Sequence, residues 1–273
     1  MKRFMKFFAW VMVAGMVFCA VSLGEAKLND EKLSDADIAT VRDILKKIDP
    51  VIKERSRANT LVTLGFNELF RPLTKAERRF LRQFFHLKTS ALGVDLSFCG
   101  MANGKEKLVK VVGQKVKVLP RDKERYKVDA RELPVQFLPP DALEAFLQMM
   151  TAMEKDIGKR LYIESAYRSS AYQLYLFIFY LKKHNYSIRE TAQFVALPGF
   201  SEHGCVRHQA LDLINADGID GQDHAEEFER LPEFAWLEAH ASKFGFVLSY
   251  PKRSLTGIRY EPWHWRYEGV KGL

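Results

Sequence analysis

Two short motifs in the C-terminal half constrain the fold of this chain more than any other feature of its sequence. The first is Ser201-Glu202-His203, followed by Asp212, and the second is Glu261-Pro262-Trp263-His264. Two histidines and one carboxylate are typical of a catalytic rather than a structural zinc site, because three protein ligands leave the fourth tetrahedral position open for water. Zinc lies only about 2.0–2.2 Å from such ligands. A fold that uses this set must therefore bring distant segments of the chain together.

Glu261 lies three residues before His264 and is the candidate for the base that takes a proton from a metal-activated water. The alternative for Glu261 is a carboxylate that orients a ligand histidine. For the first histidine ligand, His208 competes with His203. His208 lies four residues before Asp212, and in a strand at about 3.3 Å per residue this separates the two by roughly 13 Å. The sequence therefore favours His203, Asp212 and His264 as ligands.

The N-terminal end has the pattern of a secretory signal peptide. A basic stretch, residues 2–6, precedes an apolar run from Phe7 to Leu23, and Gly24-Glu25-Ala26 places small residues before a cleavage site. Residues 1–26 are therefore predicted to be removed, and the protein to act in the periplasm or cell envelope. The alternative is an uncleaved membrane anchor, since the apolar run is only slightly shorter than a membrane span. Membrane attachment is expected only in that case.

Charge and cysteine content limit the classes of partner. The 273 residues carry a formal net charge of +8, and the signal peptide accounts for two of these charges. A basic exported protein suits an anionic cell envelope, although ordinary solubility explains the charge equally well. No run of five or six basic residues and no nucleic-acid motif is present, so no nucleic acid partner is expected.

Two cysteines remain after the signal peptide, Cys99 and Cys205. An exported chain could join them in a disulfide, but two cysteines do not make a disulfide framework. Cys205 lies two residues after His203, so a thiolate ligand is a further alternative.

Apolar periodicity predicts a mainly helical first part and a mixed second part, with a boundary near Pro134. Helices are expected over residues 34–56 and 74–86, and a β-hairpin over 107–118 around Gly113-Gln114. Beyond the boundary, the predicted elements are helices over 139–157, 170–183, 188–195 and 225–244, and strands over 161–165, 209–214 and 246–250.

Four motifs in this order resemble the VanY-type D-alanyl-D-alanine carboxypeptidases, which are zinc peptidases of the bacterial cell wall. They are Ser165-Ala166-Tyr167-Arg168-Ser169 with Gln173, Ser201-Glu202-His203, Ala210-Leu211-Asp212-Leu213 and Glu261-Pro262-Trp263-His264. The family is related in fold to the VanX dipeptidases and to hedgehog signalling domains. The resemblance covers residues 134–273 and implies an α+β domain, in which a small antiparallel sheet flanked by helices holds Zn²⁺ in a cleft.

The resemblance also implies a role for each residue of the site. The expected zinc ligands are His203, Asp212 and His264, the expected catalytic base is Glu261, and the residues expected at the substrate are Arg168, Gln173 and Ser201. The planar guanidinium of Arg168 suits a terminal carboxylate or a developing oxyanion. The alternative for Arg168 is a structural salt bridge.

The chain departs from the family pattern between the first two ligands. The family has His-x-x-Gly-x-Ala-x-Asp, an interval of seven residues, whereas His203 and Asp212 are nine residues apart and 206–209 replaces the glycine. Two extra residues can bulge into solvent at little cost, because loop closure depends weakly on length. The longer interval also supports a different function, a non-catalytic or regulatory cell-wall binding module that retains the fold.

The sequence thus predicts a zinc metallopeptidase that hydrolyses peptidoglycan stem peptides, with a carboxypeptidase of the D-alanyl-D-alanine type as the leading hypothesis. A dipeptidase or a peptidoglycan endopeptidase remains open within the same enzyme class. Residues 27–133 contain no catalytic motif. They are predicted to form an accessory region that covers the peptidase, residues 134–273, or positions it on the cell wall.

Overall fold

A computed structural model describes residues 28–269 of the chain, so the predicted signal peptide lies outside the described residues. The first part of this range is mainly helical, with α1 (Asp35–Arg57), α2 (Phe66–Leu69) and α3 (Lys75–Arg82). The side chain of Ser34 caps α1 by accepting a hydrogen bond from the backbone N–H of Asp37. Thr74 caps α3 in a reciprocal capping box with Glu77. Both predicted N-terminal helices are confirmed.

The predicted hairpin over residues 107–118 is wrong, although both of its strands exist. They pair with later strands in two antiparallel ladders, β1 (Val109–Val111) with β4 (Gln136–Leu138) and β2 (Lys115–Lys117) with β3 (Ala130–Glu132). The reason lies at Gln114, whose buried side-chain amide accepts from the backbone N–H of Ile163 and donates to its carbonyl. This side chain holds the chain against the central sheet instead of letting it turn back. The short helix α4 (Lys123–Tyr126) lies between β2 and β3.

A four-stranded antiparallel sheet forms the centre of the second part. Its strands lie in the order β5-β6-β8-β7, with bounds Leu161–Ser165, Ala210–Asn215, His264–Tyr267 and Phe246–Leu248. Successive side chains of a strand point to opposite faces. Leu211 and Leu213 of β6 belong to a buried apolar core, so Asp212 between them points to the other face of the sheet. This alternation places a carboxylate in the middle of the molecule.

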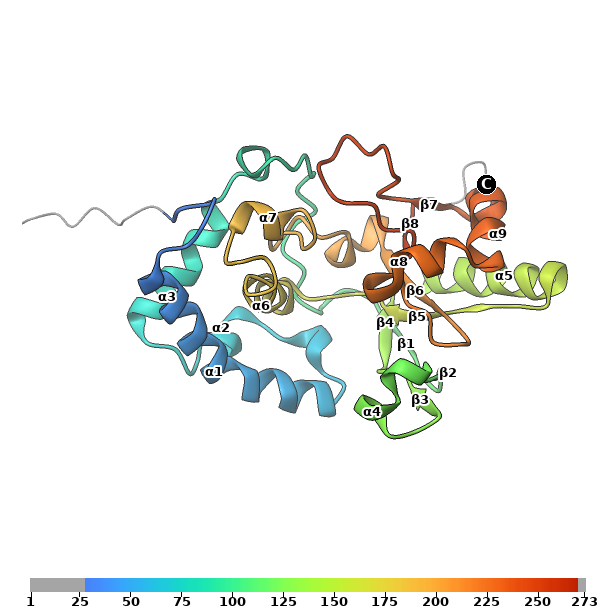
Figure 1. Ribbon diagram of the computed structural model, residues 1–273, viewed down its shortest axis with the longest axis horizontal. Coiled ribbons are helices and arrows are strands. Elements are labelled where there is room, and N and C mark those ends of the chain that lie inside the picture. The colour runs from blue at the N-terminus through green and yellow to red at the C-terminus, as the bar shows by residue number, and fades with distance from the viewer. Residues whose placement is uncertain (1–27, 270–273) are drawn as a thin grey trace, which may run out of the picture.

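Further helices complete the α+β class that the sequence predicts (Figure 1). Beside the sheet lie α5 (Pro140–Ile157), α8 (Gly221–Glu229) and α9 (Pro232–His240). Next to the N-terminal helices lie α6 (Ser170–Tyr180) and α7 (Ile188–Ala192). The helix predicted over 225–244 is in fact two helices. The break falls at Pro232, because proline has no N–H to donate and starts a new helix more readily than it continues one. α6 and α7 both end three residues earlier than predicted.

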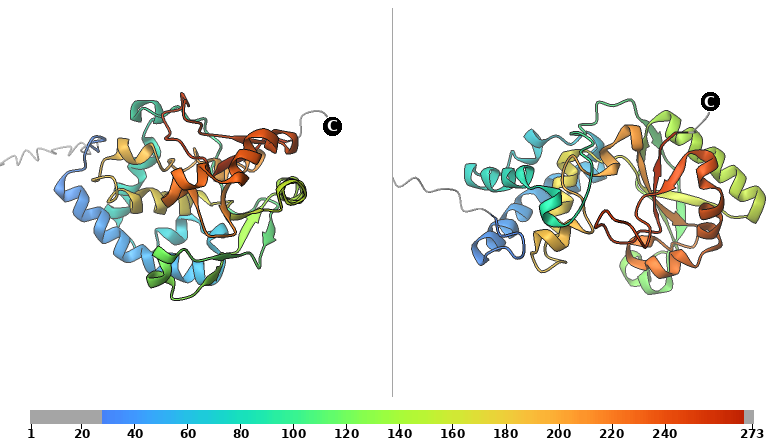
Figure 2. Two further views of the ribbon diagram at one scale, coloured as in Figure 1. Left: turned by 45° about the vertical axis from the view of Figure 1, so that its right-hand side comes forward. Right: turned by 90° about the horizontal axis from the view of Figure 1, so that it is seen from above.

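Two large hydrophobic cores hold these elements together. One lies between α5, α9 and the sheet and contains Met149, Phe246 and Trp265. The other joins the N-terminal helices to α6 and α7, and its members include Ile44 of α1 and Phe177 of α6. Figure 2 shows α1–α3 beside α6 and α7, at one end of the molecule. Residues on both sides of the predicted boundary near Pro134 thus share one core, and the division into an accessory region and a catalytic domain stays a prediction.

Within residues 28–269, every helix is too short or too polar to cross a membrane.

Candidate metal centre

Strand register brings two of the predicted ligands together. Asp212 of β6 and His264 of β8 are directly opposite one another in the antiparallel ladder, so both side chains leave the same face of the sheet. The Nδ1 atom of His264 lies 3.0 Å from Oδ1 of Asp212. A pairing between residues far apart in sequence therefore forms half of the site.

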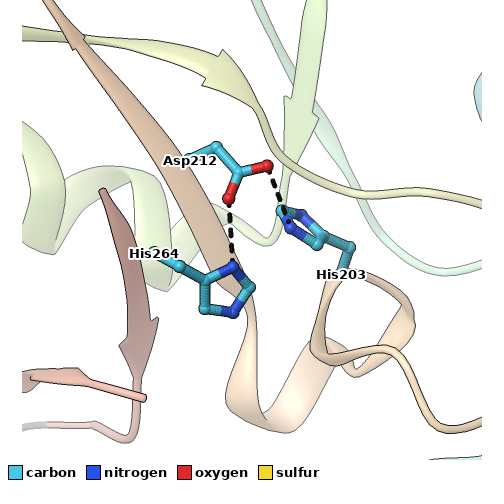
Figure 3. A group of neighbouring side chains, drawn as sticks. All are labelled: His203, Asp212 and His264. Carbon is cyan, nitrogen blue, oxygen red and sulfur yellow. Dashed lines mark hydrogen bonds and ion pairs between the residues drawn. The ribbon is translucent and has the colours of Figure 1, made fainter. Parts of the chain in front are cut away.

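His203 comes from the loop that leads into β6. It lies in a short 3₁₀ turn, Glu202–Gly204, and its carbonyl accepts a hydrogen bond from the backbone N–H of Arg168. The Nε2 atom of His203 lies 3.2 Å from Oδ2 of Asp212. Figure 3 shows the two imidazoles on either side of the carboxylate, each directed at a different oxygen.

One nitrogen of each imidazole is held by a second partner. The Nδ1 atom of His203 lies 2.7 Å from the carbonyl oxygen of Ala166. The Nε2 atom of His264 lies 3.0 Å from Oε2 of Glu202, and Arg266 holds the other oxygen of that carboxylate. Such outer partners fix the orientation of metal-binding histidines and decide which nitrogen faces the ion.

The remaining donor atoms converge. One ligand atom from each of His203, Asp212 and His264 lies within 4.8 Å of the others, and this is the one such group of metal-binding side chains among the described residues. All three residues are buried. The alternative ligand His208 is exposed and lies outside this group. Cys205, the alternative thiolate ligand, also lies outside it. The longer interval contains a three-residue 3₁₀ turn, Val206–His208, and His203, Asp212 and His264 still converge.

Glu261 lies beside this group. One of its carboxylate oxygens is 3.6 Å from Nδ1 of His264, and its side chain is 13% exposed. Burial raises the pKa of Glu261 to about 8, although the charge of His264 acts in the opposite direction. A general base is most effective when its pKa is near the working pH, so this carboxyl group suits proton transfer.

The protonation of the three clustered side chains follows from their contacts. Burial lowers the pKa of His203 to about 4. Burial would also lower the pKa of His264, but hydrogen bonds to Asp212 and Glu202 outweigh this effect and raise it to about 10. Burial opposes ionisation of Asp212, yet contacts with His203 and His264 hold its pKa well below the usual range. Metal binding to such a group displaces the proton of an imidazole, which couples affinity to pH.

The predicted substrate residues lie around the same site. Arg168 donates from one terminal guanidinium nitrogen to Asp212 at 2.7 Å and from Nε to Ser165. Gln173 is 2% exposed and donates to the carbonyl of Ala196, while its Oε1 atom is buried without a hydrogen-bond partner among the described residues. Ser201 is also buried.

A cavity of about 570 Å³ opens at the metal centre, and all seven predicted site residues line it. The N-terminal part of the chain supplies another wall, with Asn59, Leu61 and Val62. The volume falls within the range of typical ligand sites, about 300–1,000 Å³.

Two features of the site were not found from the sequence. The first is the role of Glu202, for which the only sequence signal is its position beside His203. The wall formed by Asn59 and Leu61 has no sequence signal, because it depends on how α1 packs against α6.

This combination, a buried His–Asp–His group with a carboxyl group beside it in a cavity, has the side chains that are typical of mononuclear metal centres that activate water. Comparison with known proteins specifies the family. The model of the VanY family of D-alanyl-D-alanine carboxypeptidases matches residues 136–270.

Individual relatives agree with this match. A bifunctional D-Ala-D-Ala dipeptidase and carboxypeptidase, VanXYC of Enterococcus gallinarum, is 33% identical over 49% of this chain and 68% of its own length. A D-alanyl-D-alanine carboxypeptidase of Enterococcus faecium is 34% identical over 49% of this chain, and the match covers 38% of that relative. A D,D-pentapeptidase of the VanY type, solved with Zn(II), is 26% identical over 50% of this chain and 75% of that structure, with a TM-score of 0.41. The chain belongs to the VanY family.

Proposed function

We propose that this protein is a zinc metallopeptidase that removes a terminal D-amino acid from peptidoglycan stem peptides, as a D-alanyl-D-alanine-type carboxypeptidase. The observation that carries the proposal is the convergence of His203, Asp212 and His264 within 4.8 Å, with Glu261 beside them in the wall of a cavity. Membership of the VanY family supports it. The match covers 38% of the length of the Enterococcus faecium carboxypeptidase and 28% of that of a D-alanyl-D-alanine carboxypeptidase of Enterococcus faecalis.

The donor set fits zinc. Two imidazole nitrogens and one carboxylate oxygen are ligands that Zn²⁺ accepts in catalytic sites, and the other nitrogen of each imidazole already has a partner in Ala166 or Glu202. His203 would bind through Nε2 and His264 through Nδ1, together with an oxygen of Asp212. Zinc at this position supplies Lewis-acid activation of water and of the scissile carbonyl.

Glu261 moves the proton in this proposal. Its carboxylate accepts a proton from the attacking water and passes it to the amine of the leaving amino acid. Arg168 lies at the same cavity wall and donates to Asp212. Its remaining guanidinium N–H groups bind the terminal carboxylate of the peptide or the developing oxyanion.

Gln173 and Ser201 bind the peptide end. The Oε1 atom of Gln173 has no hydrogen-bond donor among the described residues, and a backbone N–H group of the bound peptide can donate to it. Asn59 and Leu61 of the N-terminal part line one side of the cavity, which supports an accessory role for residues 27–133.

The test is hydrolysis of a stem pentapeptide that ends in D-Ala-D-Ala by zinc-loaded protein and by Glu261→Gln. Loss of a general base lowers kcat by about 10²–10⁴-fold, while bound zinc stays stoichiometric. Glu226→Gln serves as the control, because this exposed carboxyl group lies outside the cavity. Equal turnover by the wild type and Glu261→Gln, or wild-type protein that binds no zinc, would overturn the proposal.

The products separate the related activities. A carboxypeptidase releases single D-Ala, a dipeptidase releases D-Ala-D-Ala, and an endopeptidase shortens cross-linked dimers. A tetrapeptide substrate that ends in L-Lys-D-Ala tests the stereochemistry of the scissile bond. The non-catalytic binding module, which the nine-residue interval between His203 and Asp212 supports, predicts that the protein binds zinc and the peptide without any of these products.

Export and action in the periplasm or cell envelope are part of the proposal, and they rest on the sequence pattern of residues 1–26. The measurement is the mass of the protein recovered from the extracytoplasmic fraction. A mature N-terminus at Lys27 supports cleavage, whereas full-length protein in the membrane fraction supports the anchor.

A further inference from the structure

An extended segment crosses the loop that carries His203. Residues 94–106, here called the strap, contain no helix or strand. Backbone hydrogen bonds of 2.7–2.8 Å nevertheless fix the strap at three points. The N–H groups of Asp95 and Cys99 donate to the carbonyls of Thr256 and Gly199. The carbonyl of Ala102 accepts from the N–H of Ser170.

Side chains add to these contacts. The ring of Phe98 packs edge-on against Phe200, with ring centroids 5.3 Å apart. Gly199 has a φ of +85°, and a Cβ atom there would lie 2.4 Å from the ring of Phe98. A Cβ atom on Gly204 would lie 3.1 Å from Cβ of Ala102. The strap and the loop of residues 199–205 are therefore packed closely on both sides of His203.

This packing places the two cysteines of the described chain together. Cys99 of the strap is half-buried and Cys205 of the loop is 8% exposed, and both are free thiols. Their side chains share a hydrogen bond, so the two sulfur atoms face one another. Cys205 also belongs to the stretch between the two ligands in which this chain is longer than the family pattern.

We propose that Cys99 and Cys205 form a disulfide that clamps the strap onto the loop carrying His203. The inference rests on the proposed export, because disulfides persist in oxidising compartments, but it does not rest on peptidase activity. The oxidant is a protein or small-molecule disulfide. One cysteine thiolate attacks it and releases a first thiol; the second thiolate attacks the mixed disulfide and releases the second thiol. Two electrons and two protons pass in total from the cysteines to the oxidant, which leaves as two thiols.

The clamp stabilises the folded chain by closing a loop of about 100 residues, which restricts the unfolded state. For a protein of this size the typical contribution of a disulfide corresponds to an increase in Tm of about 5 °C or more. The clamp also restrains the loop that positions His203, so oxidised protein is expected to release zinc more slowly.

The experiment uses the full chain with Cys19→Ser, so that only the two cysteines react. The protein is equilibrated in glutathione mixtures of increasing oxidised share, quenched with acid, unfolded, alkylated and weighed by mass spectrometry. The expected result is the loss of two hydrogens, one linked pair of peptides containing Cys99 and Cys205, and a higher Tm than that of reduced protein. Cys99→Ser is expected to remove the Tm difference between oxidised and reduced protein.

Two outcomes would overturn the inference. One is two free thiols in the most oxidising mixture, and the other is a glutathione adduct on each cysteine without the linked pair. Peptidase assays on the same samples separate this result from the proposed function, since an active enzyme with two free thiols refutes the disulfide alone. A linked protein without turnover refutes the peptidase alone.

Discussion

Each histidine of the metal centre uses one ring nitrogen for a protein partner and keeps the other for Asp212. The two partners differ in charge. His203 bonds to a neutral backbone carbonyl, whereas His264 bonds to the carboxylate of Glu202. A carboxylate partner raises the basicity of a ligand imidazole and fixes its orientation. We therefore expect Glu202 to position His264 without contacting the substrate.

Glu202→Gln is predicted to lower the affinity for zinc by about 10–100-fold. The amide keeps the size of the side chain but loses the charge that supports His264. Competition with a chromogenic chelator measures the effect, and excess zinc should restore much of the activity. Glu268→Gln is the matched control, because Glu268 shares Arg266 with Glu202 but makes no contact with His264. Equal zinc affinity in wild type and Glu202→Gln would contradict a positioning role.

Glu164 gives the site region a pH-dependent stability. Burial raises the pKa of this carboxyl group from 4.5 to about 7, even though Arg131 pairs with it. The folded state thus holds the proton more tightly than the unfolded state. The resulting stability is fully present below the unfolded pKa near 4.5 and is lost as the pH rises through 7.

Glu164→Gln cannot ionise and so does not lose this stability. The free energy of unfolding of the variant, relative to that of wild type, should therefore rise by about 1–3 kcal/mol from pH 5 to pH 7.5. Urea unfolding of metal-free protein at the two pH values measures the gain. Glu132→Gln, at an exposed neighbour, should show no such change. A constant difference between wild type and Glu164→Gln at both pH values would refute the prediction.

The convergence of His203, Asp212 and His264 could be predicted from the sequence, because metal chemistry admits few residue types. Once His203, Asp212 and His264 are required to converge, the strand pairing of Asp212 with His264 follows in outline. Glu202 was not predictable in the same way. A glutamate beside a histidine has many roles, and only the structure shows that its oxygen meets the histidine of another strand.

Strand positions could be predicted from the sequence better than strand partners. Residues 107–118 do contain two strands, but each pairs with a later segment. Alternation of apolar and polar residues reports burial of one face, and it carries no information about the neighbouring strand. Gln114 directs the pairing of these strands through two hydrogen bonds to the backbone of Ile163. No local sequence pattern predicts this contact.

The start of α8 supports the metal centre through Gly221. A Cβ atom at this position would lie 2.1 Å from the ring of Trp263, the residue before His264. The backbone carbonyl of Trp263 accepts a hydrogen bond from Leu213 N–H, so the strand itself is held at this point. A side chain at Gly221 must push the indole away from β6 and β8.

Gly221→Ala is predicted to destabilise the protein by about 1–3 kcal/mol, the usual effect of overpacking, and to weaken zinc binding. Chemical denaturation measures the first effect. The double variant with Trp263→Leu provides the control, because the smaller side chain makes room for the methyl group. Its destabilisation should be smaller than the sum of the two single effects. Additive effects would show that Gly221 and Trp263 act independently.

The N-terminal helices and the family-matched part of the chain depend on one another. The matched region begins at residue 136, yet the core around α6 contains Ile44 and Phe84 from before it and Phe177 from within it. A change in pattern predicted a boundary near Pro134, and such a change does not show which apolar faces pack together. The N-terminal part therefore contributes to stability as well as to the cavity wall.

A chain of residues 134–273 is predicted to be unstable, because removal of the N-terminal helices exposes the apolar face of α6, including Leu174, Phe177 and Ile178. Size-exclusion chromatography should show aggregates, and heating should show no cooperative transition.

The full-length variant Ile44→Ala tests the same coupling with a smaller change. Loss of this buried side chain costs about 2–5 kcal/mol, and zinc release should coincide with unfolding. A monomeric 134–273 chain that unfolds cooperatively and retains full peptidase activity would show instead that the N-terminal part is a separate accessory domain.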